Sequence, residues 1–121
     1  MVETRRRAPD DVLPLSPIAL QVLLAIADGD KHGYAILKDV DRRTDGKVAL
    51  GASSLYAVLK RLLAEGLVEE AAERPDPALD DERRRYFRLT AFGRRAAVAE
   101  LKRLEAVLAQ GRAKRLLLGR G

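Results

Sequence analysis

Three side chains that can donate hydrogen bonds to an anion lie close together near the middle of the chain. They are Ser53, Lys60 and Arg61. Hydroxyl groups can bond phosphate oxygens or base edges, while ammonium and guanidinium groups can bond phosphate or guanine. The residues between them include no charged side chain, so nothing there would repel a polyanion. The pattern is typical of a surface that binds nucleic acid.

An amphipathic helix over residues 51–65 would hold these groups together. At about 100° per residue, the apolar residues fall on one side of this helix. They are Leu55, Val58, Leu59 and Leu62. The opposite side carries Ser53, Ala57, Lys60, Arg61 and Ala64. This small, basic front suits a nucleic-acid groove, and an ordinary solvated helix face is the alternative interpretation of the same pattern.

A second basic cluster consists of Arg83, Arg84 and Arg85. The residues just before it, 76–82, are rich in carboxylates. Two interpretations are open for the arginines. They can reach a nucleic-acid backbone, or they can pair within the chain with Asp80, Asp81 and Glu82. Because phosphate repels carboxylates, we expect no deep insertion of the acidic segment into nucleic acid.

Composition excludes most enzyme chemistry. The chain has no Cys and a single His, His32. It therefore offers no thiolate, no His cluster for a metal and no histidine-dependent triad. We expect His32 to be a helix-start residue with a satisfied side chain, because no second ligand accompanies it. The sequence predicts no catalytic residue, no metal and no cofactor, and the chain is not expected to be an enzyme.

Length and charge limit the other possibilities. A chain of 121 residues accommodates one compact domain and one projecting element. No apolar stretch approaches the roughly 20 residues that span a bilayer, and residues 1–14 lack the apolar core of a secretory signal. We expect a cytoplasmic protein without a membrane partner. The net charge of +5 suits a polyanion.

That charge is unevenly distributed. Residues 94–121 hold eight Lys and Arg against Glu100 and Glu105, so residues 1–93 are close to neutral. Net basicity therefore does not locate a binding face, and local clusters must do so.

Capping and periodicity predict the order of elements. Ser16 and Pro17 open a first helix, which extends to Ala27 and is apolar enough to lie at the centre of the core. A second helix begins at His32 and extends to about Arg43. Its expected inner stripe is Tyr34, Leu37 and Val40. The helix over 51–65 is the third.

Strand patterns occur at three places after the second helix. Residues 48–50 are a candidate short strand, and residues 67–70 and 84–89 predict a hairpin with a long polar tip. Thr90 can then cap a final helix that begins at Ala91 and ends near Gly111.

The final helix carries an apolar stripe at a spacing of three to four residues. The stripe contains Phe92, Ala97, Leu101, Leu104 and Leu108. Because we expect no core to remain for it to cover, we predict a two-fold dimer built on residues 91–110. The alternative is that the stripe packs back on the first helix of the same chain.

Three helices followed by a two-stranded hairpin form the layout of a winged helix, in which the hairpin is the wing. We therefore expect an α+β chain, mainly α, built as a winged helix-turn-helix with a C-terminal dimerisation helix. Residues 1–14 would be a flexible basic arm, residues 15–90 the DNA-binding domain, and residues 91–121 the dimerisation helix with a basic tail.

The chain also resembles the PadR family of bacterial transcriptional regulators, in the shorter subgroup with one C-terminal helix. Matching segments occur in family order between Leu15 and Gly93. They are Leu15-Ser16-Pro17, His32-Gly33-Tyr34, Gly51 with Ser54-Leu55-Tyr56, Leu59-Lys60-Arg61-Leu62, Glu65-Gly66-Leu67-Val68, and residues 84–90 with Gly93. Each segment alone is weakly specific, and the ordered set is specific.

The resemblance implies a homodimeric, repressor-type regulator of double-stranded DNA whose third helix enters the major groove and whose wing touches the adjacent backbone. It implies DNA contacts by Ser53, Ser54, Tyr56 and Lys60, with Arg61 beside them. Tyr34 can offer its hydroxyl to a phosphate or place its ring in the core. Ala52 and Ser53 stand where many relatives carry Pro and Gly, so the preferred DNA sequence is not transferable.

A different class of function is the main alternative. The acidic hairpin tip and the near-neutral first 93 residues also suit a winged-helix module that binds protein instead of DNA. A small-molecule effector of unknown identity is a further possible partner. With no Trp and only two Phe, we expect no large aromatic-lined cavity for it.

Overall fold

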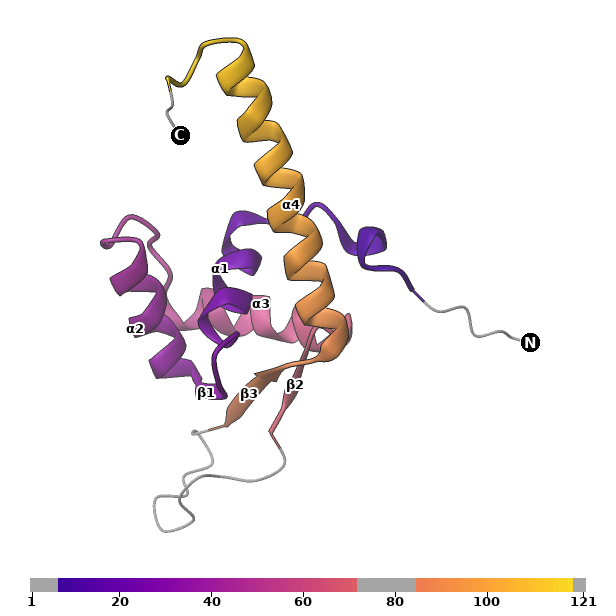
Figure 1. Ribbon diagram of the computed structural model, residues 1–121. Coiled ribbons are helices and arrows are strands. Elements are labelled where there is room, and N and C mark those ends of the chain that lie inside the picture. Colours follow the sequence, from indigo (N-terminus) through magenta and orange to yellow (C-terminus); the bar gives the residue numbers. More distant parts are fainter. Residues whose placement is uncertain (1–6, 72–84, 119–121) are drawn as a thin grey trace, which may run out of the picture.

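The computed structural model describes residues 7–71 and 85–118 (Figure 1). The elements follow the chain as η1 (Pro9–Val12), α1 (Pro17–Ala25), β1 (Lys31–His32), α2 (Gly33–Arg43), α3 (Ala52–Ala64), β2 (Val68–Glu70), β3 (Tyr86–Leu89) and α4 (Ala91–Ala113). Helices α1, α2 and α3 and the small sheet form one body, from which the far end of α4 projects. The expected winged-helix architecture, mainly α with a small antiparallel sheet, is confirmed.

Side-chain caps define where α1 and α2 begin. The Ser16 hydroxyl accepts a hydrogen bond from the Ala19 amide (3.1 Å), and His32 Nδ1 accepts one from the Ala35 amide (3.3 Å). These bonds satisfy amides that have no partner inside the helix. His32 is thus a helix cap, as expected. Helix α1 ends at Ala25, two residues earlier than predicted.

The sheet has three strands in the order β1-β3-β2, and both pairings are antiparallel. Lys31 lies opposite Phe87 and Val68 opposite Leu89. The prediction of a strand over residues 48–50 is wrong, because the Val48 amide bonds the Thr44 hydroxyl (3.3 Å) in the turn after α2. The third strand is β1, which the sequence did not predict. It covers the edge of β3 that β2 leaves open.

Helix α1 lies at the centre of the core, as predicted: Val22 and Leu23 are fully buried. Helices α2, α3 and α4 all pack against it. The inner stripe predicted for α2 is wrong at Tyr34, which is 65% exposed. Ile36 takes the inner position instead, with Val40. The capping His32 sets the start of α2 so that Tyr34 falls in the exposed first turn.

Helix α4 has two different halves. Its first half contacts η1 and α1, and its buried residues are Gly93, Ala96, Ala97 and Glu100. The expectation that no core remained for this helix is therefore wrong for its first half, and Ala97 belongs to the core of its own chain. From Leu101 onward every residue as far as Gln110 is exposed.

The start of the described chain is packed and does not form a free arm. Helix η1 lies against α4. The Arg7 guanidinium donates a hydrogen bond to the Glu65 carbonyl (3.0 Å) at the end of α3 and lies 5.0 Å from the centre of the Phe92 ring. The expected flexible arm over residues 1–14 is therefore not found for residues 7–14, and residues 1–6 lie outside the described part.

Two contacts fix the join between β3 and α4. The Thr90 hydroxyl accepts a hydrogen bond from the Gly93 amide (2.8 Å) and donates one to the Gly66 carbonyl (2.7 Å). Gly93 itself lies against the Leu67 carbonyl, and a Cβ there would overlap that oxygen. A glycine is therefore required for the close approach of α4 to the start of β2.

Glu100 is the buried acid of α4, with only 2% of its surface exposed. The Arg103 guanidinium donates two hydrogen bonds to its carboxylate (2.9 and 2.7 Å). These bonds, with one from the Leu15 amide, favour the charged form and lower the pKa of Glu100 below its usual value.

We predict that Gly93→Ala lowers the free energy of unfolding by about 1–3 kcal/mol, the usual cost of forcing an extra methyl group into a packed site. Gly111→Ala is the matched control, because a Cβ at Gly111 in the same helix meets nothing within 4 Å. That control should raise the free energy by about 0.5–1 kcal/mol, since alanine favours a helix over glycine. Urea unfolding measures both, and equal effects would contradict the steric role of Gly93.

We predict that Glu100→Gln alters the pH dependence of stability. The folded chain holds this carboxylate at a pKa below the 4.5 of the unfolded chain, so the unfolded chain binds the proton more readily. The stabilisation is therefore complete above about pH 4.5 and is lost as the pH falls through the folded-state pKa. The stability difference between wild type and Glu100→Gln should shrink on acidification.

Urea titrations from neutral to acidic pH measure that difference. Glu105→Gln is the control, since it removes an exposed carboxylate of the same helix. A Glu100→Gln difference that stays constant with pH would contradict the prediction.

Candidate nucleic-acid interface

One side of α3 is buried and the other is exposed, as the sequence predicted. Leu55, Leu59 and Leu62 are 0–3% exposed. The exposed residues on the opposite side, called the α3 front, are Ser53, Ser54, Ala57, Lys60, Arg61 and Ala64. Neither Lys60 nor Arg61 makes a hydrogen bond or ion pair with another described side chain, so both can bind an external anion.

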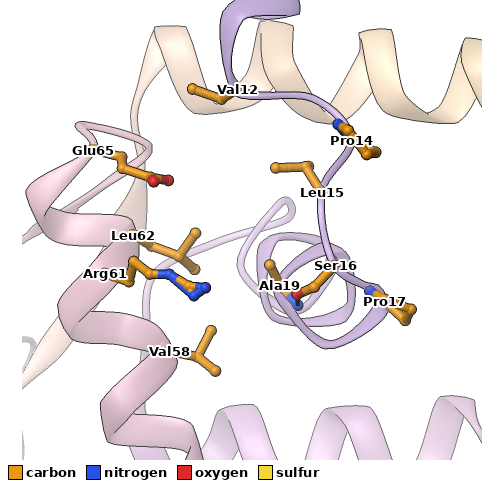
Figure 2. Close-up of a pocket in the computed structure, with 10 residues that line it drawn as sticks. All are labelled: Val12, Pro14, Leu15, Ser16, Pro17, Ala19, Val58, Arg61, Leu62 and Glu65. Atoms are coloured by element: carbon orange, nitrogen blue, oxygen red, sulfur yellow. Dashed lines mark hydrogen bonds between the residues drawn. The ribbon is translucent and has the colours of Figure 1, made fainter.

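The two cations of the α3 front point to different flanks. Figure 2 shows Arg61 extending from α3 toward Ser16 and Ala19, on the rim of a cavity of about 410 Å³ between α3 and the start of α1. The walls of this cavity are mixed: aliphatic side chains such as Val58 stand beside Ser16 and Glu65. Lys60 lines a separate groove on the β3 side of α3. The α3 front therefore carries one positive charge on each edge.

The groove beside Lys60 has an aromatic floor. It holds about 380 Å³ and is lined by Tyr56, Leu59, Lys60, Leu63, Arg85 and Phe87. The Tyr56 and Phe87 rings meet edge to face, with centres 6.5 Å apart. Tyr56 is 38% exposed, and its hydroxyl lies close to Gly33 at the start of α2. Tyr56 therefore lies on the flank of α3, between the start of α2 and β3.

Tyr34 stands at the start of α2 with its ring largely in solvent, so the choice between core and surface is settled in favour of the surface. The His32 ring is stacked against it, with centres 6.5 Å apart and an angle of 12° between the planes. Lys38 Nζ lies 5.4 Å from the Tyr34 ring centre. These contacts hold the ring near a positive charge, where its hydroxyl can meet an anion.

Arg85 is paired within the sheet. Its guanidinium donates two hydrogen bonds to the Glu70 carboxylate, one from Nε at 2.6 Å and one from Nη2. It also lies 5.4 Å from the Phe87 ring centre. The alternative partners Asp80, Asp81 and Glu82 lie outside the described residues, as do Arg83 and Arg84. No local sequence pattern points to Glu70, because this partner comes from the neighbouring strand.

A second ion pair crosses the same sheet. Arg88 of β3 binds Asp30, just before β1 (3.1 Å), and lies 3.9 Å from Glu69 of β2. Glu69 lies opposite Arg88 and Glu70 lies opposite Phe87, so this pair lies on the other face of the sheet from the pair of Arg85 and Glu70. The positive charge at the base of the wing is therefore largely compensated among the described residues.

The far half of α4 presents an apolar face. Val98, Leu101, Leu104, Val107 and Leu108 are each 39–49% exposed. Part of this face forms a shallow groove whose rim carries Lys102 and Glu105. Of the stripe predicted for dimerisation, Leu101, Leu104 and Leu108 lie on an exposed surface. Ala97 is buried in its own chain, and Phe92 is partly buried against the core.

Other kinds of site are not found within residues 7–71 and 85–118. No group of three His, Cys, Asp or Glu side chains there could hold a metal ion. In that same part of the chain, no helix combines the length and apolar character needed to cross a membrane.

The fold and the α3 front together define a winged-helix module of the kind that binds DNA. The family model of the transcriptional regulator PadR-like family matches residues 22–99. The chain therefore belongs to this family, as its motifs implied. It is a DNA-binding transcriptional regulator and not an enzyme.

Two uncharacterised proteins are similar in sequence to this chain. An uncharacterised protein of Lysinibacillus sphaericus is 32% identical over 80 residues, which cover 66% of this chain and 70% of that protein. An uncharacterised 37.1 kDa protein from a Streptomyces fradiae transposon is 41% identical over 73 residues, 60% of this chain. That match spans only 19% of the transposon protein.

Solved structures share the fold at low sequence identity. A transcriptional regulator from Clostridium thermocellum has a TM-score of 0.67 and 22% identity, and the match covers 83% of this chain and 90% of that one. A PadR-like transcriptional regulator from Bacillus cereus has a TM-score of 0.66 and 20% identity, over 85% of this chain and 93% of that one.

Proposed function

We propose that this chain is a sequence-specific transcriptional repressor that binds a near-palindromic operator as a homodimer in the cytoplasm. The observation that carries the proposal is the α3 front, which is exposed, small and basic. A helix of this kind can enter the major groove, where base edges carry a readable pattern of donors and acceptors. A small dimer seated on a promoter would block access to it.

The α3 front supplies the proposed base and phosphate contacts. Ser53 and Ser54 lie in the first turn, where a recognition helix comes nearest to base edges. Lys60 and Arg61 occupy opposite edges of the front, so they can reach the two phosphate backbones that border one major groove. The small side chains of Ala57 and Ala64 add no bulk to the α3 front.

Residues outside α3 supply the proposed flanking contacts. The exposed Tyr34 hydroxyl and that of Tyr56 can each bond a phosphate oxygen. Arg85 can do so only by exchanging Glu70 for phosphate, because the two are paired. Arg83 and Arg84 remain predictions outside the described residues.

The apolar face of α4 supports the proposed dimer. Five aliphatic side chains exposed along about three turns would be costly to leave in water. A second copy offers the same face, and a two-fold pairing would bury both. The two α3 fronts would then read half-sites about 34 Å apart or a multiple of that distance.

We predict that the protein selects a defined sequence from random duplexes and binds it more tightly than random DNA at moderate salt. If each dimer neutralises 6–10 phosphates, its affinity should fall by about 10³–10⁵ between 50 and 200 mM salt. Fluorescence anisotropy titrations measure the affinity for each duplex and its dependence on salt concentration. Equal affinity for selected and random duplexes would contradict the proposed function.

We predict that Lys60→Ala weakens DNA binding. If Lys60 holds a phosphate, the affinity for every duplex should fall by a similar factor, and the salt slope should fall by about 1 per lost contact. If it reads a base, the preference for the selected sequence should relax instead. Lys114→Ala removes the same charge at the distant end of α4 and serves as the control. Wild-type affinity and preference in Lys60→Ala would exclude Lys60 from the interface.

We predict that Leu104→Glu shifts the protein from dimer to monomer, because it places a charge in the middle of the proposed apolar interface. Light scattering during size-exclusion chromatography measures the mass. Ala106→Glu, an exposed position on the opposite side of α4, is the control and should remain dimeric. A wild-type protein that is monomeric at all working concentrations would rule out the dimer.

A further inference from the structure

Gly33 is buried at the start of α2, where it faces the ring of Tyr56 on α3. A Cβ built on Gly33 would overlap Tyr56 Oη and would lie 2.9 Å from Cζ and 3.4 Å from Cε2. These separations leave no room for a methyl group beside the ring. The same ring meets Phe87 of β3 edge to face, with centres 6.5 Å apart, so a shift of the ring to make room would alter that contact as well.

The backbone at Gly33 does not itself require glycine. Gly33 has the helical conformation of α2, and its φ does not lie in the left-handed region. At such a position alanine normally stabilises a helix relative to glycine. The reason for a glycine here is therefore the space that the Tyr56 ring occupies.

The ring of Tyr56 connects three elements at one point. It belongs to α3, touches the start of α2 at Gly33 and packs on β3 at Phe87. The start of α2 also carries the exposed Tyr34 next in sequence, and α3 carries the front with Lys60. The hydroxyl end of the ring thus sets how closely the start of α2 can approach α3, and both would contact the same DNA.

We propose that Gly33 is a positioning residue for DNA recognition: by leaving space for the Tyr56 ring, it fixes the placement of the α3 front relative to the start of α2, and so the preference for the operator. Gly33 acts through Tyr56 and need not touch DNA. For its DNA readout, the inference rests on the proposed function.

The test is a double-mutant cycle with Gly33→Ala, Tyr56→Leu and their combination, each measured by anisotropy against the selected operator and against random duplex. Leucine lacks the Cζ and Oη atoms that the new methyl group would meet. We expect Gly33→Ala alone to weaken operator binding at least about tenfold, within the range of coupling between neighbouring residues. Binding to random duplex should weaken less, since phosphate contacts carry no sequence information.

The Tyr56→Leu background gives the decisive comparison. There, Gly33→Ala should change operator affinity by less than about twofold, because the clash is absent. Gly111→Ala is the matched control: it makes the same substitution in α4, away from the α3 front, where a Cβ meets nothing within 4 Å. Wild-type binding by Gly33→Ala, or the same loss in both backgrounds, would overturn the inference.

Folding of the variants provides a second readout. Should Gly33→Ala alone fail to fold by circular dichroism, a folded double variant supports the inference and an unfolded one overturns it. Failure of the wild type to select any operator would count against the proposed function. In that case, the unfolding free energies of the wild type, the two single variants and the double variant test the contact between Gly33 and Tyr56. Non-additive changes support the inference, and additive changes overturn it.

Discussion

The burial of Leu55, Leu59 and Leu62 is the constraint on which the rest of the structure depends. Their side chains are almost completely removed from water against α1, α2 and the start of β2. Burying one stripe of a helix fixes its rotation about its own axis, since any other rotation would expose these leucines. The opposite side must then face outward. Lys60 and Arg61 therefore need no partner in the chain to be held at the surface.

Features that depend on a few neighbouring residues could be predicted from the sequence. Ser16 and Thr90 mark helix starts because a hydroxyl caps amides two or three residues away. The α3 front follows from a spacing of three to four residues within one helix. For the same reason, the apolar stripe on the exposed part of α4, which includes Leu104, could be predicted.

Features that depend on distant partners could not be predicted. The two-residue strand β1 forms only because β3 lies beside it, and Ala97 is buried only because η1 and α1 cover α4. The pairing of Arg85 with Glu70 joins two strands, so no local pattern reports it. The segment containing Gly33 matches the family motif. The steric reason for a glycine there depends on Tyr56, which belongs to another helix.

Thr90 is the single residue between β3 and α4, and it is held by hydrogen bonds on both sides. The helix thus leaves the sheet without a flexible linker. At 23 residues, α4 is about 35 Å long, so a tilt of about 5° at Thr90 moves its far end by about 3 Å. Conversely, a force applied at the far end of α4 acts on the sheet through a lever arm of about 35 Å.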